Sequence, residues 1–201
     1  MVVIVDYQMG NLRSVQKALE KVGCAAEISS DPNRIAEADK VVLPGVGACG
    51  DAYDEIVRRG LAPAIREHIA KDKPFLGICL GLQLLFEFSE EGGSKPCLGV
   101  FPGKIVRFEV PHEYKVPHMG WNQTKSIRPH RLLTGIESGS HFYYVHSYYA
   151  APKDEELVAM TADYPTPFCA AISRGRLFAT QFHPEKSQAA GLALLKNFAA
   201  L

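Results

Sequence analysis

The sequence predicts an α/β fold: a parallel-rich central sheet with helices on both faces, followed by a strand-rich second half. Up to about residue 90, short apolar runs alternate with segments of helical periodicity, as in parallel strands joined by crossover helices. After Gly92 the segments shorten and turn residues separate them, which favours further strands. The 201 residues are 47% hydrophobic, enough for one sizeable core, so we expect a single domain over residues 1–201.

The first elements are predicted to form a β-α-β unit. The β-branched run Val2–Val5 is typical of a buried strand. The apolar residues that follow it recur at helical spacing, and Gly23 is expected to end that helix before a short strand at 25–28. The helical face comprises Leu12, Val15, Leu19 and Val22.

The pattern then repeats. Residues 41–43 form a third strand-like run, and two helical segments at about 50–59 and 61–71 follow it, separated at Gly60. Residues 75–78 are a fourth apolar run. The sequence after this run, with Leu82, Leu85 and Phe86 apolar, predicts another helix.

The second half is predicted to consist mainly of strands, closed by a terminal helix at 191–201 in which Leu192, Leu195 and Phe198 are apolar. Turn residues separate the strand-like segments, and Arg174-Gly175 joins the last two of them. These segments are 103–108, 121–125, 141–150, 157–163, 168–173 and 176–182.

Charge and composition argue against several classes of protein. Lys plus Arg and Asp plus Glu both number 22 with no basic block, so the electrostatic signature of a nucleic-acid-binding protein is absent. The start MVVIVDYQMG lacks the features of a signal peptide, and the apolar stretch 74–86 is too short to span a membrane. Five cysteines, an odd number, suit reduced thiols. We therefore expect a cytoplasmic protein without a membrane or nucleic-acid partner.

Cys79 lies in the segment Gly77-Ile78-Cys79-Leu80-Gly81, where a buried strand is predicted to give way to a helix. A cysteine in an apolar run is usually a core residue. Small residues on both sides, however, would allow the sharp turn of a nucleophile elbow, with the helix N-terminus favouring the thiolate. Cys79 is therefore a candidate nucleophile at the carboxyl end of a parallel strand.

A cysteine nucleophile needs a base and a group that orients the base. The strand-like run ending at Phe182 is followed by His183-Pro184-Glu185. Residues two apart in an extended chain face the same side, so Glu185 is expected to reach the imidazole of His183. The loop Pro44-Gly45-Val46-Gly47, after another strand, could offer backbone N–H groups to an oxyanion.

These motifs resemble those of the class I (triad) glutamine amidotransferases, over nearly the whole chain. GICLG with Gln83 four residues after Cys79, and HPE at 183–185, carry the resemblance. Six segments in the same order are similar to one branch of the family, in which a glutaminase subunit passes ammonia to a (β/α)₈-barrel cyclase subunit. These segments are DYQMGNLRSV, LPGVGACGDA, GICLGLQLLFEFSEEG, PHMGWN, YYVHSYY and QFHPEKS.

The resemblance implies a mechanism. Cys79 attacks the side-chain amide of glutamine to form a γ-glutamyl thioester, His183 transfers protons and Glu185 orients His183. The backbone N–H of Leu80 and one from the glycine loop hold the oxyanion, after a rearrangement of that loop. The implied oxyanion residues are Leu80, Val46 and Gly47, and the implied substrate-binding residues are Gly45, Gln83, Glu91, His146, Ser147 and Tyr148.

The resemblance also implies a face that meets the cyclase subunit in a heterodimer. Trp and Tyr are favoured at protein interfaces, and the only Trp lies in PHMGWN. No cofactor is implied, and no metal site is expected because no other ligands lie at useful spacing from His118. The implied interface residues are Asn11, Pro117, His118, Met119, Gly120, Trp121, Asn122, Tyr143 and Lys186.

Other functions remain open at the level of the sequence. The chain could be the glutaminase subunit of another class I amidotransferase, against which PHMGWN and HPEKS argue. It could be an unrelated cysteine hydrolase with a nucleophile elbow, against which the late HPE argues. It could also be a binding module on the same fold, although such a module need not keep Cys79, His183 and Glu185 together.

Overall fold

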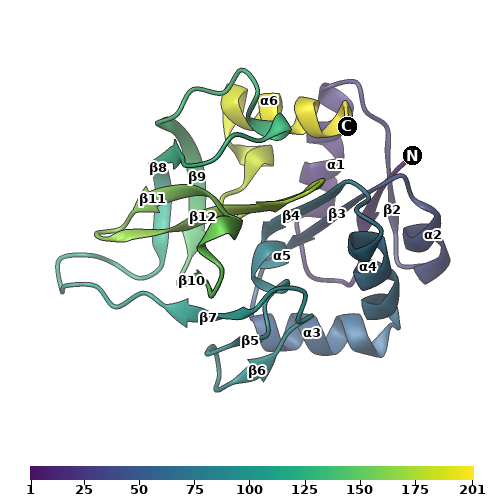
Figure 1. Cartoon of the computed structure of the whole chain (residues 1–201). Coiled ribbons are helices and arrows are strands. Elements are labelled where there is room, and N and C mark those ends of the chain that lie inside the picture. The colour runs from purple at the N-terminus through teal and green to yellow at the C-terminus, as the bar shows by residue number, and fades with distance from the viewer.

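The computed structural model describes residues 1–201, and its central feature is a 13-stranded sheet (Figure 1). Five neighbouring strands of this sheet are parallel, so crossover segments must connect them. Helices connect β1, β2, β3 and β4, whereas the antiparallel strands lie between β4 and β13 in the sequence. In spatial order they are β2 (Ala26–Ser29), β1 (Val2–Val5), β3 (Lys40–Gly45), β4 (Phe75–Cys79) and β13 (Leu177–Thr180).

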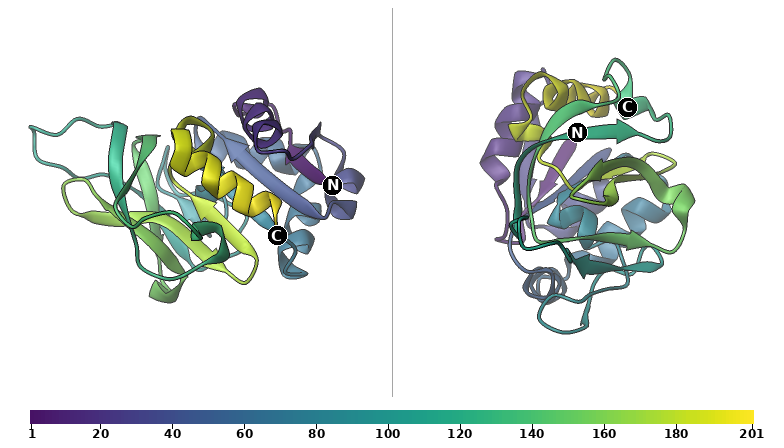
Figure 2. Two further views of the ribbon diagram at one scale, coloured as in Figure 1. Left: turned by 90° about the horizontal axis from the view of Figure 1, so that it is seen from above. Right: turned by 90° about the vertical axis from the view of Figure 1, so that its left-hand side faces the viewer.

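Helices cover both faces of the parallel strands, as the sequence predicts (Figure 2). The helices α2 (Pro32–Glu37), α3 (Cys49–Arg58) and α4 (Leu61–Ala70) pack on one face. The helices α1 (Leu12–Lys21) and α6 (Gln188–Ala199) pack together on the other. The inner strands β1, β3, β4 and β13 are therefore buried on both faces, which explains their largely apolar sequences, whereas the edge strand β2 is only half-buried.

Alternate residues of one strand face two different cores. In β1, Val3 and Val5 join the core under α2, α3 and α4, whereas Val2 and Ile4 join the core under α1 and α6. Burying a side chain of this size stabilises the fold by roughly 1.5–3 kcal/mol. The sheet is thus fixed in register by its side chains on both faces.

The second half of the chain forms the antiparallel part of the sheet, which lies on the side of the molecule away from α2 (Figure 1). Strand β12 joins it to the parallel part by pairing with β13. Strand β8 pairs with both β9 and β11. The strands are β5 (Phe88–Ser89), β6 (Lys95–Pro96), β7 (Gly103–Arg107), β8 (His118–Ser126), β9 (Ser140–His146), β10 (Tyr148–Pro152), β11 (Val158–Asp163) and β12 (Pro167–Arg174).

The predicted elements are confirmed with two corrections. The expected strand 141–150 is two strands, β9 and β10, with a break at Ser147. The helix expected to continue through Phe86 is wrong in length, because α5 covers only Leu80–Gln83. The carbonyls of residues 84–86 bond to N–H groups of residues 98–101 instead of continuing a helix. The short strands β5 and β6 were not predicted, nor was helix α2, although Asp31 caps α2 and Pro32 starts it.

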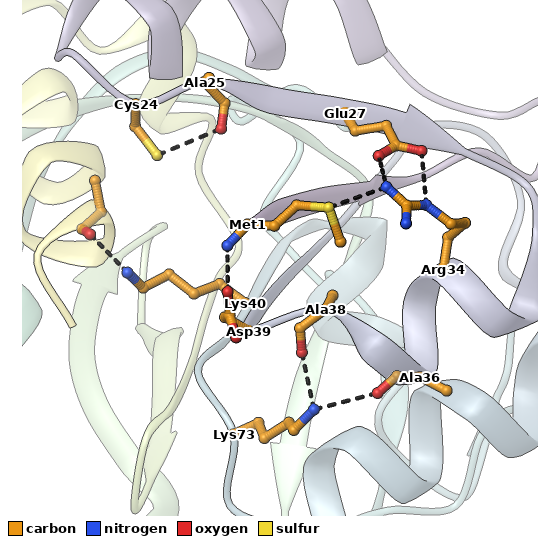
Figure 3. Close-up of polar contacts among 11 residues, drawn as sticks. Met1, Cys24, Ala25, Glu27, Arg34, Ala36, Ala38, Asp39, Lys40 and Lys73 are labelled. Atoms are coloured by element: carbon orange, nitrogen blue, oxygen red, sulfur yellow. Dashed lines mark hydrogen bonds and ion pairs between the residues drawn. The ribbon is translucent and has the colours of Figure 1, made fainter.

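The amino ends of the parallel strands are held by polar contacts (Figure 3). Lys73 donates to the carbonyls of Ala36 and Ala38 at 3.2 and 2.9 Å, and Lys40 donates to Ala199 at 2.7 Å. These contacts tie helices and strands together at one end of the sheet, opposite the ends at which β3 and β4 reach Gly45 and Cys79. None of the helices is long and apolar enough to cross a membrane.

Candidate active site

Three adjacent strands bring the candidate catalytic residues to one edge of the sheet. Strand β4 lies between β3 and β13 and is parallel to both. In register, Gly45 of β3 lies beside Cys79, and Thr180 of β13 lies beside Ile78. The loop after β3, the thiol at the end of β4 and His183 after β13 therefore meet at the carboxyl ends of the strands.

Cys79 has the backbone of a nucleophile elbow. Its φ of +54° and ψ of −105° lie in a region that a residue with a side chain rarely adopts, so the backbone is strained. Glycines make the turn possible. A β-carbon on Gly81 would overlap the carbonyl oxygen of Leu43, and one on Gly77 would lie 2.9 Å from the carbonyl oxygen of Gly81.

His183 and Glu185 form a buried pair. His183 Nδ1 lies 2.9 Å from Glu185 Oε1, and their side chains are 2% and 1% exposed. The contact expected from the sequence is confirmed, but the backbone reason for it was wrong. Pro184–Lys186 form a 3₁₀ turn, η3, and not an extended segment. His183 Nε2 and Glu185 Oε2 are buried without a hydrogen-bond partner.

The surroundings of His183 favour its charged form. Burial alone would lower the pKa of its imidazole, but the nearby Cys79 and the hydrogen-bonded Glu185 outweigh it and raise the pKa to about 10. An imidazole beside a thiol and a carboxylate is therefore held as a proton donor. Nε2, the nitrogen not bonded to Glu185, is free for proton transfer.

A cavity of about 490 Å³ opens beside Cys79, and we call it the Cys79 cavity. The structure brings nearly all the expected oxyanion and substrate-binding residues to its wall, along with Pro117, which was expected at the interface. Gly45 lies just outside, packed against Tyr7 and Leu80. The wall consists of Val46, Gly47, Ala48, Cys79, Leu80, Gln83, Glu91, Pro117, Val145, His146, Ser147 and Tyr148.

Gln83 is buried and connected to Cys79 through a residue that the sequence reading missed. Its Nε2 donates to the carbonyl of Tyr148 at 2.8 Å and to Gln181 Oε1 at 3.1 Å. Gln181 Nε2 in turn lies 3.6 Å from Cys79 Sγ. Gln181 directly follows the largely apolar run 177–180. A polar side chain in such a position is buried and needs hydrogen-bond partners, and this was the signal by which the sequence could have indicated it.

Glu91 and the glycine loop are connected as well. Glu91 Oε2 accepts a hydrogen bond from the backbone N–H of Cys49 at 3.0 Å, at the start of α3. The hydroxyl of Tyr7, a fully buried residue, donates to the carbonyl of Pro44 at 2.8 Å. Both contacts hold the segment that contains Val46 and Gly47, one from each end.

The expected interface residues divide into two sets because side chains alternate along β8. Met119 and Trp121 point outward and are 62% and 47% exposed. Trp121 lies opposite Tyr143 of β9, with ring centroids 6.0 Å apart, and Lys186 Nζ lies 5.7 Å from the Tyr143 ring. These four residues form an exposed group, in which only Tyr143 is half-buried. Asn11 is also exposed, before α1.

His118 departs from the expectation that this stretch as a whole faces outward. His118 is only 4% exposed, and its ring stacks on that of Tyr164, with ring centroids 4.1 Å apart. Its Nδ1 lies 2.9 Å from Nε2 of His146. Asn122 lies on the same inner side and contacts His118. No group of three or more His, Cys, Asp or Glu residues in the structure could hold a metal ion.

The arrangement is suited to nucleophilic acyl transfer. It combines a thiol on a strained turn, a buried imidazole and carboxylate pair, and backbone N–H groups near the thiol, with a cavity of mixed polar and apolar lining alongside. Because Glu91, Gln83 and backbone groups share the wall, the cavity can accept a ligand with both charged and amide groups.

The chain is similar to known glutamine amidotransferases over almost its whole length. The sequence model of the class I glutamine amidotransferase family matches residues 3–200. Two relatives named imidazole glycerol phosphate synthase subunit HisH, from Rhodopirellula baltica and Syntrophotalea carbinolica, are 59% and 54% identical. The alignments cover 99% and 98% of this chain and 97% and 98% of those proteins. A third, from Moorella thermoacetica, is 52% identical over 100% of this chain and 94% of that protein.

Solved structures share the fold at low sequence identity. A structure described as a glutamine amidotransferase matches with a TM-score of 0.77 and 17% identity, over the full length of both chains. A structure of PurLQS from Thermotoga maritima also matches with a TM-score of 0.77 and 17% identity, over 99% of this chain and 96% of that one. These likenesses confirm the fold class expected from the sequence.

Proposed function

Because this chain belongs to the class I glutamine amidotransferase family, we propose that it is the glutaminase subunit of an imidazole glycerol phosphate synthase, acting in histidine biosynthesis. The contact that carries this proposal is the buried His183–Glu185 pair next to Cys79 on its strained turn. The relatives named as HisH support the choice of synthase. We also propose that residues 1–201 act as one domain and work in the cytoplasm, where Cys79 stays reduced.

In the proposed reaction, Cys79 Sγ attacks the carboxamide carbon of glutamine. The carbonyl oxygen becomes an oxyanion, and the C–N bond breaks after the imidazolium of His183 donates a proton to the leaving nitrogen. Ammonia leaves and a γ-glutamyl thioester remains. Water, deprotonated by His183, then attacks the thioester, and glutamate and the thiol are released. Glu185 keeps the imidazole oriented throughout.

The oxyanion is proposed to receive hydrogen bonds from the N–H of Leu80 and from an N–H at Val46 or Gly47. All three residues line the Cys79 cavity next to the thiol. Each such donor is worth on the order of 10²–10³ in rate. Tyr7 and Glu91 hold the two ends of the glycine loop. The orientation of the loop between these contacts decides whether an N–H of Val46 or Gly47 points at the oxyanion.

Glutamine is proposed to lie along the cavity wall. Gln83 and Glu91 hold it, with the Glu91 carboxylate on its ammonium end, together with backbone groups of His146, Ser147 and Tyr148, which form the facing wall. A charged amino acid needs such polar contacts because an apolar cavity alone would not compensate for the loss of its hydration.

The proposed partner is a (β/α)₈-barrel cyclase subunit in a heterodimer. Ammonia in neutral water is mostly protonated to ammonium, which is not a nucleophile, so the product must pass directly to the next site. The cyclase would use it to make imidazole glycerol phosphate and an aminoimidazole carboxamide ribonucleotide. The exposed group of Met119, Trp121, Tyr143 and Lys186, with Asn11, is the proposed contact face.

The direct test is glutamate release from glutamine by the complex with a candidate cyclase subunit and its ribonucleotide substrate. Cys79→Ala should abolish release while partner binding persists. Cys169→Ala removes a buried thiol from β12, away from the cavity wall, and should leave release intact. Release by the Cys79→Ala complex at the wild-type rate would exclude the proposed nucleophile.

The choice of partner has its own test. We expect the isolated chain to be nearly inactive, and the ligand-bound complex to be at least 10²-fold faster, the value of one oxyanion donor. Trp121→Ala should weaken partner binding or activation. If only a different synthase subunit activates the chain, the alternative function as the glutaminase of another class I amidotransferase is the correct one.

A further inference from the structure

A continuous chain of hydrogen bonds runs through the interior between β8 and the wall of the Cys79 cavity. Asn122 Nδ2 lies 3.3 Å from Nε2 of His118, and His118 Nδ1 lies 2.9 Å from Nε2 of His146. His146 Nδ1 lies 2.9 Å from the carbonyl oxygen of Tyr148. That carbonyl also accepts the hydrogen bond from Gln83. The chain therefore ends on the contact that holds a substrate-binding side chain.

The direction of every bond in this chain follows from its ends. A carbonyl oxygen only accepts, so His146 must carry its proton on Nδ1. Its Nε2 is then an acceptor when the ring is neutral, so His118 must donate from Nδ1. His118 Nε2 is left to accept from the amide of Asn122, whose other contact is a donation to the carbonyl of Asp163 at 2.9 Å. With this single arrangement of protons, the Asn122 amide, both histidine rings and the Tyr148 carbonyl all have hydrogen-bond partners.

The surroundings keep both rings neutral. His118 lies among the rings of Phe108, Tyr144, Tyr164 and Phe168, and no Asp or Glu side chain is bonded to either histidine. Burial lowers the pKa of His118 to about 4 and is the main cause that lowers the pKa of His146 to about 3. A second proton on His146 would place two N–H groups against each other.

We propose that His118 is a positioning residue for glutamine binding: by fixing the tautomer of His146, it holds the Tyr148 carbonyl that orients Gln83. The inference rests on the proposed glutaminase function. His118 reaches neither the substrate nor the triad, and it is not part of the cavity wall. Without its N–H, the ring of His146 can move its proton to Nε2 and release Tyr148.

The tautomers can be measured on the wild-type protein without any activity assay. Nitrogen-15 NMR at neutral pH should show the rings of His118 and His146 both neutral and both protonated on Nδ1. A spectrum with either ring protonated on Nε2, or charged, would overturn the proposal.

The kinetic test uses the complex with the cyclase subunit. His118→Leu should raise the KM for glutamine about 10-fold or more, the effect of leaving a buried acceptor unpaired, with a smaller change in kcat. His118→Asn should restore much of the KM, because the asparagine amide can place an N–H near the position of Nδ1. An unchanged KM in His118→Leu, or equal defects in the Leu and Asn variants, would refute the proposal.

Tyr164→Phe is the matched control. It keeps the ring that stacks on His118 and removes a hydrogen bond to the carbonyl of Lys115 that lies outside the chain. Its KM should equal that of wild type. If wild-type complex does not hydrolyse glutamine, the proposed function fails; if wild type is active and the Leu variant binds glutamine normally, only the role of His118 fails.

Discussion

The parallel and the antiparallel parts of the sheet contribute to the site in different ways. The parallel part positions Cys79 through its backbone: strand register, a positive φ and glycines that permit close approach. The antiparallel part, with the segment after β13, acts through side chains: His183, Glu185, Gln181 and the pair His118–His146. Backbone placement tolerates no added atoms, whereas a side-chain network tolerates substitutions that keep its donors and acceptors.

The largest effects are expected at the side chains that are proposed to transfer protons. His183→Ala should cost about as much activity as Cys79→Ala, whereas Glu185→Ala, which removes only the orienting group, should lower kcat by on the order of 10²–10⁴. Steady-state kinetics of the complex measure both. Because the residues act as a unit, the double variant Cys79→Ala, His183→Ala should be no worse than either single one.

The charge on His183 adds a pH dependence of stability. Its pKa is raised from 6.5 to about 10, so its stabilising contribution is complete below pH 6.5 and is lost as the pH rises toward about 10. In Glu185→Ala this loss should be smaller, because one of the groups that raise the pKa is gone. Urea unfolding at pH 7 and pH 9.5 compares the two proteins, and an equal loss in both would contradict the assignment.

A backbone substitution tests the parallel part. Gly81→Ala places a β-carbon against the carbonyl of Leu43, so we expect a loss of about 3 kcal/mol in the free energy of unfolding and a displaced Cys79. Gly50→Ala is the control. It lies in the first turn of α3, and its β-carbon would lie 2.9 Å from Cγ of the exposed Lys95, which must shift. The gain in helix propensity offsets part of this cost, so we expect a loss of at most about 1 kcal/mol. Equal stability of the two variants would argue against close backbone approach at the elbow.

Gln181 tests whether the side-chain network reaches Cys79, the proposed nucleophile. Gln181→Met keeps the length of the side chain but loses the N–H near Cys79 Sγ and the acceptor for Gln83, so kcat/KM should fall about 10-fold. Alkylation of Cys79 by iodoacetamide should also slow. Thr180→Val, the neighbouring buried change, removes a hydrogen bond to the carbonyl of Phe182 and should leave alkylation unchanged.

The smallest expected effect is an acid sensitivity of the antiparallel part. Since the pKa values of His118 and His146 are lowered from 6.5, the unfolded chain binds protons below pH 6.5 that the folded chain excludes, and stability falls as the pH drops. Between pH 6.5 and 5, His118→Asn should lose less stability than wild type, by at most about 1.4 kcal/mol per pH unit. Urea unfolding across this range measures the difference, and parallel slopes would mean that His118 is charged when folded.

The sequence alone predicted the parallel strands and the candidate catalytic residues Cys79, His183 and Glu185. Buried parallel strands are continuous apolar runs, an elbow needs small residues beside the nucleophile, and His183 and Glu185 are two residues apart, so each signal is local. The motifs near Gln83 and Glu91 predicted cavity residues that the structure places together.

The tertiary structure alone decided what depends on distant partners. Helix α5 ends at Gln83 because N–H groups of residues 98–101 take the carbonyls of residues 84–86. His118 turns inward because β8 alternates and His146, 28 residues away, supplies its partner. Gln181 contacts Cys79, although the two residues are 102 positions apart in the sequence. Hydrogen bonds of this kind leave no periodic pattern in the sequence, because their donors and acceptors are brought together only by packing.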